Sequence, residues 1–382
     1  MITLKGMAWD HPRGFDPMVA TSKEFSKKYP EVEIMWEKRS LQAFADRPIE
    51  EMAFDYDFMI IDHPHVGEAS RKGLLLDLSS FDNFTDNLSI LKKQTVGASH
   101  ESYNFNNHQY ALAVDAASPV SAYRSDLIKQ IPKTYEDVIM LAENKKVMWP
   151  IKPVDSVSSF NTIAANIGYP INRTDGDFID NKIGMEILKM MKALANLLPK
   201  ICLTMNPIEV LDYMSENNDI AYCPLLYGYS NYARKGFRSS IINFSNIPTF
   251  NQEKNNCSGS QIGGTGLAIS KKTKEINLAL EYTFWVASSE SQENTYYYSG
   301  GQPGNIEAWK NKSINDDCNN FFLDTLETLE KAWLRPRYDG YMYYQDVAGT
   351  IINKYLASDS SAESVIDDLR IQFNKSFYVN KK

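Results

Sequence analysis

The chain of 382 residues lacks any run of about 20 apolar residues, the length that a membrane-spanning helix needs. It also lacks a recognisable signal segment, because Met1 is followed at once by the strand-like residues 2–5. We therefore expect either a cytoplasmic protein or a mature chain from which a leader has been removed.

An excess of basic residues is also missing. Lysine and arginine number 40 against 48 aspartate and glutamate, which gives a formal net charge of -8. Nucleic acids and anionic membranes both attract basic surfaces, so neither is expected as the main partner. Hydrophobic residues make up 43% of the chain, enough for sizeable cores, and the length suits two or three domains.

Cysteine is sparse and occurs in no C-x-x-C pair, which argues against a structural zinc site. If oxidised, the four cysteines allow three pairings, and four buried free thiols are an equally open alternative. The positions concerned are Cys202, Cys223, Cys257 and Cys318.

Catalytic signatures are absent as well. There is no G-x-S-x-G elbow. The glycine-rich residues 263–266 lack the Lys-Ser/Thr of a phosphate-binding loop and precede a strand. All five histidines come before residue 109, far from the first cysteine at position 202. No cofactor is expected, although the many carboxylates leave a hydrolase with a carboxylate pair open.

The first third of the chain alternates strands and helices. Strands are expected at residues 2–5, 32–36 and 58–61, and a helix over residues 17–28 capped by Asp16. The continuous apolar run at 58–61 is typical of a central parallel strand that is covered on both faces. This β-α-β rhythm predicts an α/β fold with a mostly parallel sheet.

The rest of the chain continues the alternation. Thr134 and Asp137 have the spacing of a reciprocal helix cap. Apolar residues over 183–198 form one helical stripe, which is more simply core than a cofactor site. Further strands are expected at residues 110–114, 220–226 and 267–270, with helices over 275–287 and beyond 319.

Recognition-type side chains follow the first strand: Trp9, Asp10, His11 and Arg13. Loops at the carboxyl ends of strands are where open α/β sheets bind ligands, so the indole is a candidate stacking surface and the polar side chains are candidate hydrogen-bond partners. The competing structural interpretation pairs Arg13 with Asp10 or Asp16.

A second such group, Asp62, His63 and His65, ends the strand at 58–61. Hydrogen bonding to a ligand is one interpretation of these residues. A three-imidazole metal site with His11 and a purely structural role remain the alternatives.

Other candidates follow later strands. Asp115 is a possible acceptor from ligand hydroxyls or a turn cap, and Tyr227 and Tyr229 combine an apolar ring with a polar tip. Backbone amides near Gly264 and Thr265, and the amide of Gln302 in the 299–304 loop, can donate to a bound oxygen or simply form tight turns.

Taken in order, several segments resemble the family 1 extracellular solute-binding proteins of bacterial ABC transporters, in particular the carbohydrate-type branch. The ordered set carries the resemblance, and the strand within 263–270 followed by a helix ending at residue 287 is the most family-like stretch. The matching segments are residues 6–14, 56–65, 112–115 leading to 122–126, 263–270 and 299–304.

The resemblance implies a periplasmic-binding-protein fold of class II type, with two α/β lobes joined by two or three crossings and a ligand cleft between them. The N-terminal lobe would hold residues 1–114 and 265–315, and the C-terminal lobe residues 115–264 and 316–382. The cleft residues implied are Trp9, Asp10, His11, Arg13, Asp62, His63, His65, Asp115, Tyr227, Tyr229, Gly264, Thr265 and Gln302.

It further implies a periplasmic or extracellular monomer, tethered if it is a lipoprotein, that closes on a small polar solute and delivers it to a membrane-embedded ABC permease. A sugar or polyol is expected, and a sugar acid stays open because Arg13, Arg335 and Arg337 are able to meet a carboxylate. The alternative outside this class is a cleft hydrolase or a His-dependent metal-binding protein.

Overall fold

The computed structural model describes residues 1–40, 49–171, 174, 176–251 and 256–380 and divides the chain into two compact units. Unit 1 comprises Met1–Ala117, Gly263–Asn315 and Arg337–Asp339. Unit 2 comprises Ser118–Ile262, Asp316–Pro336 and Gly340–Lys382. The boundaries that we expected at residues 114 and 265 lie within three residues of these, whereas the short return at 337–339 was not expected.

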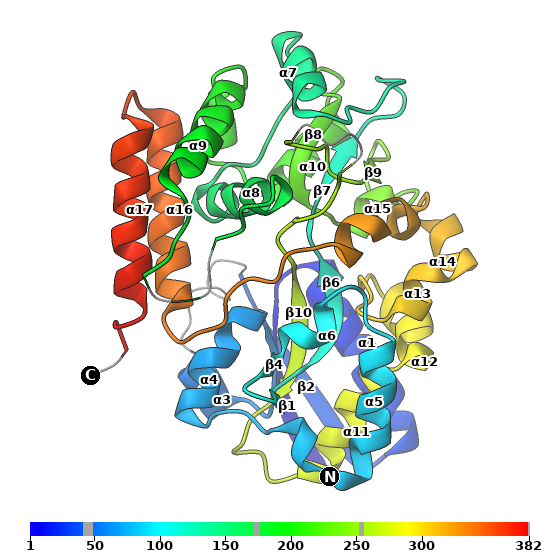
Figure 1. Cartoon of the computed structure of the whole chain (residues 1–382). Helices are drawn as coiled ribbons and strands as arrows, with labels where there is room; N and C mark the ends of the chain where they lie inside the picture. Colours follow the sequence, from blue (N-terminus) through cyan, green and yellow to red (C-terminus); the bar gives the residue numbers. More distant parts are fainter. Residues whose placement is uncertain (41–48, 172–173, 175, 252–255, 381–382) are drawn as a thin grey trace. The chain divides into compact units, whose positions relative to one another are not determined.

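Unit 1 is built on a five-stranded sheet with the order β2-β1-β3-β10-β6 (Figure 1). β1 pairs in parallel with β2 and β3, while β10 runs antiparallel to both of its neighbours, β3 and β6. The strands are β1 (Ile2–Trp9), β2 (Val32–Arg39), β3 (Phe58–Ile61), β6 (Leu112–Ala117) and β10 (Gly263–Ile269), with a separate hairpin of β4 (Asn104–Phe105) and β5 (His108–Gln109).

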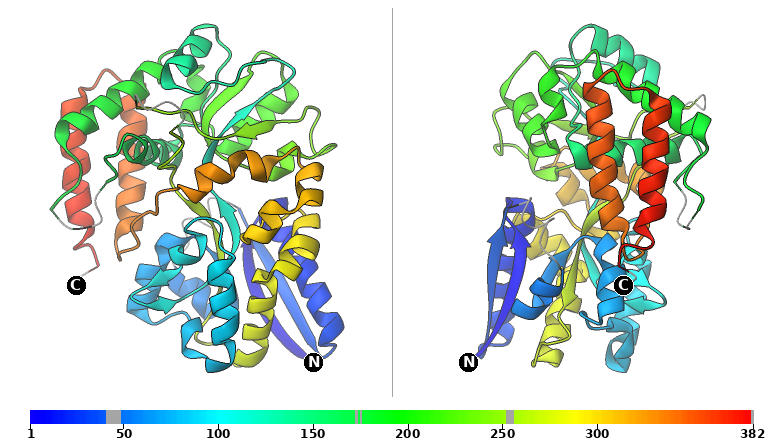
Figure 2. Two further views of the ribbon diagram at one scale, coloured as in Figure 1. Left: turned by 45° about the vertical axis from the view of Figure 1, so that its right-hand side comes forward. Right: turned by 90° about the vertical axis from the view of Figure 1, so that its left-hand side faces the viewer.

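Helices cover both faces of this sheet. α1 and α11 share one face, where the Tyr282 hydroxyl lies 2.9 Å from that of Thr21 and 3.1 Å from that of Ser22. Figure 2 shows α3 on the opposite face, as right-handed β-α-β crossovers require. The helices are α1 (Pro12–Lys28), α3 (Ile49–Asp55), α4 (Val66–Lys72), α5 (Thr85–Lys93), α6 (Ser99–Ser102), α11 (Ile276–Ala287), α12 (Ser289–Ser291), α13 (Ile306–Lys310) and α14 (Lys312–Asp317).

Three local predictions in unit 1 are wrong. β1 continues to Trp9 because the whole stretch pairs with β2, so the expected loop is strand up to that residue. α1 begins at Pro12 and not at Asp16, because the His11 ring Nδ1 caps the helix by accepting from the Arg13 amide at 3.0 Å. Likewise, the expected glycine turn at 263–266 is part of β10.

Unit 2 contains a three-stranded antiparallel sheet, β8-β7-β9. The expected reciprocal cap of Thr134 and Asp137 is confirmed, and so is the core role of the 183–198 stripe, since Ile187, Met191 and Leu194 are buried. The strands are β7 (Pro119–Tyr123), β8 (Tyr222–Tyr227) and β9 (Asn243–Ser245). The helices are α7 (Tyr135–Glu143), α8 (Pro153–Asn166), α9 (Asn181–Ala195), α10 (Pro207–Glu216), α15 (Phe321–Glu330), α16 (Tyr341–Ala357) and α17 (Ala362–Ser376).

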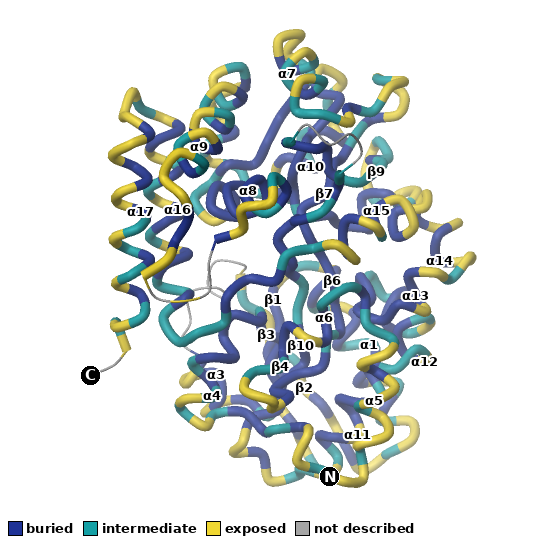
Figure 3. The backbone as a smooth tube through the Cα atoms, viewed as in Figure 1, coloured by how far each residue is buried: buried dark blue, intermediate teal, exposed yellow. Residues whose placement is uncertain are grey.

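The cores follow from these layers. Figure 3 shows β3, β7 and β8 as buried, whereas the outward faces of α9 and α17 are exposed. All four cysteines are buried free thiols. Among the described residues, no helix combines the length and apolar composition that crossing a membrane requires.

Candidate functional site

The carboxyl end of β1 places an indole against an imidazole. The rings of Trp9 and His11 are stacked, with centroids 5.2 Å apart and planes within 9°. Gly14 in α1 lies directly beneath the indole, because a Cβ at this position would come within 2.2 Å of Trp9 Nε1. The first turn of α1 therefore approaches the indole as closely as only glycine permits.

Asp10 lies apart from this stack. Its side chain is half-exposed and forms an ion pair of 2.8 Å with Lys38 of β2. The hydrogen bond from Lys38 to Asp10, reinforced by the carboxylate charge, raises the pKa of the lysine. Of the four predicted residues Trp9, Asp10, His11 and Arg13, Asp10 is thus the most exposed.

Arg13 and Asp115 bind each other. Arg13 Nε donates to Asp115 Oδ2 at 2.7 Å and Nη2 donates to Oδ1 at 2.6 Å, with the two side chains only 4% and 2% exposed. The predicted pairing of Arg13 with Asp10 or Asp16 is therefore wrong. Asp115 lies within β6 and not in a turn after it, so the turn-cap alternative is also wrong. Burial and then the charge of Asp115 raise the pKa of nearby Tyr296.

The group after β3 is held by its own backbone. Asp62 caps a short 3-10 helix, His63–His65, by accepting from the His63 amide at 3.0 Å. The His63 ring is fully buried, lies 3.3 Å from the Asp62 carboxylate and meets Tyr103 edge-on at 6.2 Å. Within the described residues, no three His, Cys, Asp or Glu side chains are grouped as metal ligands, so His11, His63 and His65 do not form the three-imidazole set.

Candidates from the second half of the chain lie at the β6–β10 end of the same sheet. Gly264 and Thr265 are strand residues that pair with Ala116 and Asp115. The Gln302 side chain is buried and donates from Nε2 to the Ala116 carbonyl at 2.9 Å. The 299–304 loop is therefore fastened to β6, directly beside the Arg13–Asp115 pair.

In unit 2, Tyr227 ends β8 and is joined to a buried amide chain. Gln261 Nε2 donates to the Tyr227 hydroxyl at 2.9 Å, and Asn161 Nδ2 donates to Gln261 Oε1 at 2.7 Å. Asn161 Oδ1 is buried and has no hydrogen-bond partner in the described part of the chain. No motif marks Asn161 or Gln261, since 100 residues separate them in sequence, and our sequence analysis missed both.

Tyr229 follows in the same loop and is held by aromatic packing. Its ring meets Tyr232 edge-on, with centroids 6.5 Å apart. The Tyr232 hydroxyl donates to Asp212 at 2.6 Å, and Arg238 Nε donates to the same oxygen at 2.8 Å. Burial and the bond to Asp212 raise the pKa of Tyr232. Tyr232 thus fixes the loop that carries Tyr229 onto α10.

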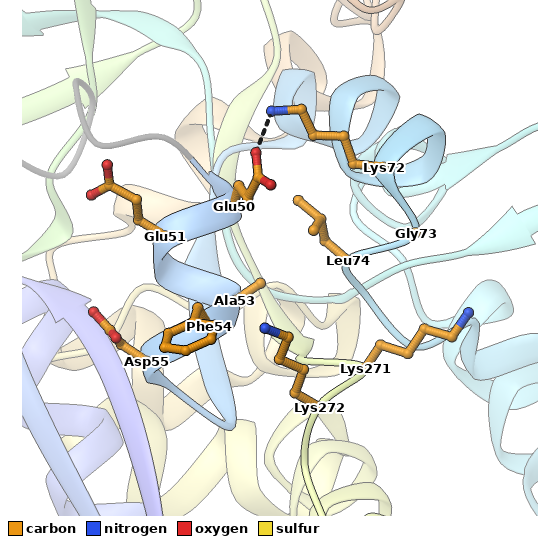
Figure 4. Close-up of a pocket in the computed structure, with 10 residues that line it drawn as sticks. All are labelled: Glu50, Glu51, Ala53, Phe54, Asp55, Lys72, Gly73, Leu74, Lys271 and Lys272. Carbon is orange, nitrogen blue, oxygen red and sulfur yellow. Dashed lines mark hydrogen bonds and ion pairs between the residues drawn. The ribbon is translucent and has the colours of Figure 1, made fainter.

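A surface groove of about 640 Å³ in unit 1 contains none of the predicted residues (Figure 4). Lys72 donates to Glu50 at 2.8 Å on one side of it. The groove lies at the amino end of β3, because Lys271 and Lys272 follow β10, whose last residue, Ile269, pairs with Phe58. Its remaining lining residues are Glu51, Ala53, Phe54, Asp55, Gly73 and Leu74.

Comparison with known proteins gives a structural likeness only. No family model and no curated protein sequence matches the chain. Maltose-bound MalE3 of T. maritima superposes with a TM-score of 0.84 at 14% identity, over 98% of this chain and 100% of that one.

Two further solved structures are similar. A solute-binding protein of an Agrobacterium radiobacter K84 ABC transporter, in complex with ribitol, gives a TM-score of 0.81 at 16% identity over 98% of each chain. One from Thermotoga lettingae TMO, bound with alpha-D-tagatose, gives 0.81 at 15% identity over 99% of this chain and 100% of that one. These neighbours are binding proteins and not enzymes. The chain therefore has the two-unit α/β fold of the ABC-transporter solute-binding proteins, along its whole length.

Proposed function

We propose that the chain is the solute-binding component of an ABC importer, which captures a sugar or polyol outside the cytoplasmic membrane and delivers it to a membrane permease. The observation that carries this proposal is the full-length likeness to solute-binding proteins, whose solved complexes contain maltose, ribitol and tagatose. The chain acts as a monomeric binder without catalytic activity.

The residues of unit 1 that contact the solute are those at the ends of β1 and β3. Trp9 and His11 provide the ring surface, and Asp10, Asp62, His63 and His65 provide directional hydrogen bonds. This combination suits a sugar, because aromatic rings pack on its apolar face while polar groups bond to its hydroxyls. Discrimination follows because a buried polar group left without a partner is costly, about 1–3 kcal/mol.

Arg13, Asp115, Gly264 and Gln302 support these contacts, while Thr265 offers its hydroxyl from β10. Arg13 and Asp115 satisfy each other, and Gln302 donates to backbone. Mutual satisfaction of a buried ion pair fixes the geometry of the strand ends around it. These four residues therefore affect solute binding indirectly, because they hold the solute-contacting residues at the ends of β1 and β3 in place.

In unit 2 the contacts come from Tyr227 and Tyr229, together with the buried Asn161 Oδ1. Gln261 donates to the Tyr227 oxygen and Asn161 donates to Gln261, so the phenol and the Asn161 amide are held in one chain of hydrogen bonds. The Asn161 Oδ1 acceptor at the end of this chain matches a solute hydroxyl group, which can donate to it. Solute binding then favours the closed arrangement of a pre-existing hinge equilibrium.

A neutral solute is favoured over a sugar acid. The three arginines that were candidates for a carboxylate all have protein partners: Arg13 with Asp115, Arg335 Nη1 with Gln345 at 2.9 Å, and Arg337 Nη1 with the Glu101 carbonyl at 2.6 Å. A carboxylate would therefore have to share each of these guanidinium groups with a protein acceptor that already binds it.

A thermal-shift panel of neutral sugars, polyols and sugar acids, followed by calorimetric titration, tests the proposal. We expect at least one neutral sugar or polyol to raise the melting temperature of the protein. A panel in which only the sugar acids raise it is not expected. Tyr227→Phe is expected to weaken that binding about tenfold, because it removes one hydrogen bond of the kind worth about 1.5 kcal/mol. Tyr213→Phe, which removes a surface bond to Asp219, is the matched control and should bind as the wild type does. Stabilisation by no member of the panel would contradict the proposal.

A further inference from the structure

Three consecutive residues, Arg337–Asp339, belong to unit 1 although the chain on either side belongs to unit 2. We call this stretch the strap. The chain passes between the units at 117/118, 262/263 and 315/316, and it enters and leaves the strap at 336/337 and 339/340. A segment of only three residues stays on unit 1 only if specific contacts hold it there.

The first fastening is made by the Arg337 guanidinium. Its Nη1 donates to the backbone carbonyls of Glu101 at 2.6 Å, Ser102 at 3.3 Å, and Asn104. The Glu101 and Ser102 carbonyls lie at the end of α6 and the Asn104 carbonyl lies in β4, so the three stand on both sides of Tyr103 in the chain. A cation at the carboxyl end of a helix is favourable, because it meets carbonyls that have no partner within the helix.

The second fastening is to α4. A Cβ on Gly67 would come within 1.9 Å of the Arg337 carbonyl oxygen, so the strap backbone lies directly against this helix. Asp339 also accepts from Arg71 of α4. α4 begins at Val66, directly after the short 3-10 helix His63–His65, so the strap packs against the helix that follows His63–His65.

Tyr103, which lies between the carbonyls bound by Arg337, contacts His63 at the start of the turn that leads into α4. Its hydroxyl is within hydrogen-bond reach of the carbonyls of Ile61 at 3.2 Å and Gly264 at 3.3 Å, at the ends of β3 and β10. Its ring meets the buried His63 imidazole edge-on. One residue, Arg337, therefore holds the carbonyls on both sides of the tyrosine that packs against His63.

We propose that Arg337 is a positioning residue that couples the strap, which lies between the fourth and fifth passages of the chain between the units, to the orientation of His63. A movement of the strap is transmitted through the end of α6 to Tyr103, and from there to the imidazole and to the ends of β3 and β10. That the coupling serves solute capture rests on the proposed function; the coupling itself does not.

The test uses the full chain and a variant with Arg337→Gln. Histidine side-chain ¹⁵N spectra report the His63 ring, and spin labels at the exposed positions of Lys23→Cys and Asp367→Cys report the distance between the units. We expect Arg337→Gln to shift the His63 resonances and to broaden the distance distribution without any solute. Affinity for whichever of maltose, ribitol or tagatose binds should fall about fivefold or more.

Arg370→Gln is the matched control, since Arg370 donates to the Ile179 carbonyl at 2.7 Å within unit 2. It should leave the His63 resonances and the distance distribution unchanged. Tyr103→Phe should reproduce part of the Arg337→Gln effect, and the double variant should show less than the sum of the two. Wild-type resonances and distances in Arg337→Gln, or strict additivity, would overturn the coupling. If none of the three solutes binds, the proposed function is called into question while the spectroscopic readouts still decide the coupling.

Discussion

Arg13 and Asp115 lie 102 residues apart in sequence and form a buried ion pair with two nearly parallel hydrogen bonds. The pair ties the first turn of α1 to the edge strand β6. Both charges are almost fully removed from water, so each depends on the other for its stability in the fold. Substituting one partner alone leaves the other charge buried.

Asp115→Asn is therefore expected to lower the free energy of unfolding by about 3–5 kcal/mol, measured by urea denaturation. Glu327→Gln is the control for an exposed ion pair: Glu327 accepts from Lys331 at 2.7 Å, and the two side chains are 51% and 53% exposed. Loss of this bond should cost less than about 1 kcal/mol. If the two variants lost the same free energy of unfolding, burial of the Arg13–Asp115 pair would make no difference to its contribution to stability.

Asp155 in α8 makes stability depend on pH. Burial raises its pKa to about 8, against an opposing effect of the Lys152 charge and a reinforcing effect of Glu209. The folded chain thus keeps a proton that the unfolded chain releases between about pH 4 and 8. The contribution of Asp155 to the free energy of unfolding is fully present below the pKa of the unfolded chain. It is lost as pH rises through the pKa of the folded chain, and the total loss is on the order of 5 kcal/mol.

Asp155→Asn should remove this slope and raise stability at pH 8, as followed by urea denaturation from pH 5 to 9. Asp359→Asn, at an exposed position, provides the control and should retain the wild-type slope. A wild-type slope in Asp155→Asn would assign the pH dependence to other groups.

Gly14→Ala is expected to displace the Trp9 indole, because the new Cβ would lie 2.2 Å from Nε1. The cost of such overpacking is about 1–3 kcal/mol. The Trp9 indole N–H resonance should move and sugar affinity should fall, whereas Lys23→Ala on the exposed side of the same helix should change neither. An unmoved indole resonance would contradict the close contact.

Tyr232→Phe should loosen the loop that carries Tyr229. The change removes the hydroxyl bond to Asp212, which keeps its bond from Arg238, so stability should fall by only about 1 kcal/mol. Calorimetry should show a larger loss in solute binding than in stability. Tyr135→Phe, which removes a bond to the Met190 carbonyl, should lower stability alone.

Elements with local causes could be predicted from the sequence. The apolar run of β3 has the bounds that we expected, Phe58–Ile61. The cap formed by Thr134 and Asp137 needs only two residues three positions apart. Both signals are complete within a few residues, so no distant partner was needed to interpret them.

The missed features depend on distant partners. The extension of β1 to Trp9 exists because Gly6 to Trp9 pair with Trp36 to Arg39 of β2. The glycines of β10 are strand residues because Ala116 and Ala117 lie opposite, although glycine is a poor strand former. The partner of Arg13 is likewise set by the register of β6 and not by any neighbour in sequence.

The position of β10 has a consequence for how the chain reaches its native state. This strand lies between β3 and β6, yet it is synthesised only after the whole of residues 118–262. Until then the first 117 residues expose two unpaired strand edges, the kind of surface that promotes aggregation. The sheet of unit 1 can therefore be completed only after β10 has been synthesised as far as Ile269, whereas the 118–262 segment can begin to collapse earlier. A chain truncated before residue 263 is expected to be insoluble for this topological reason.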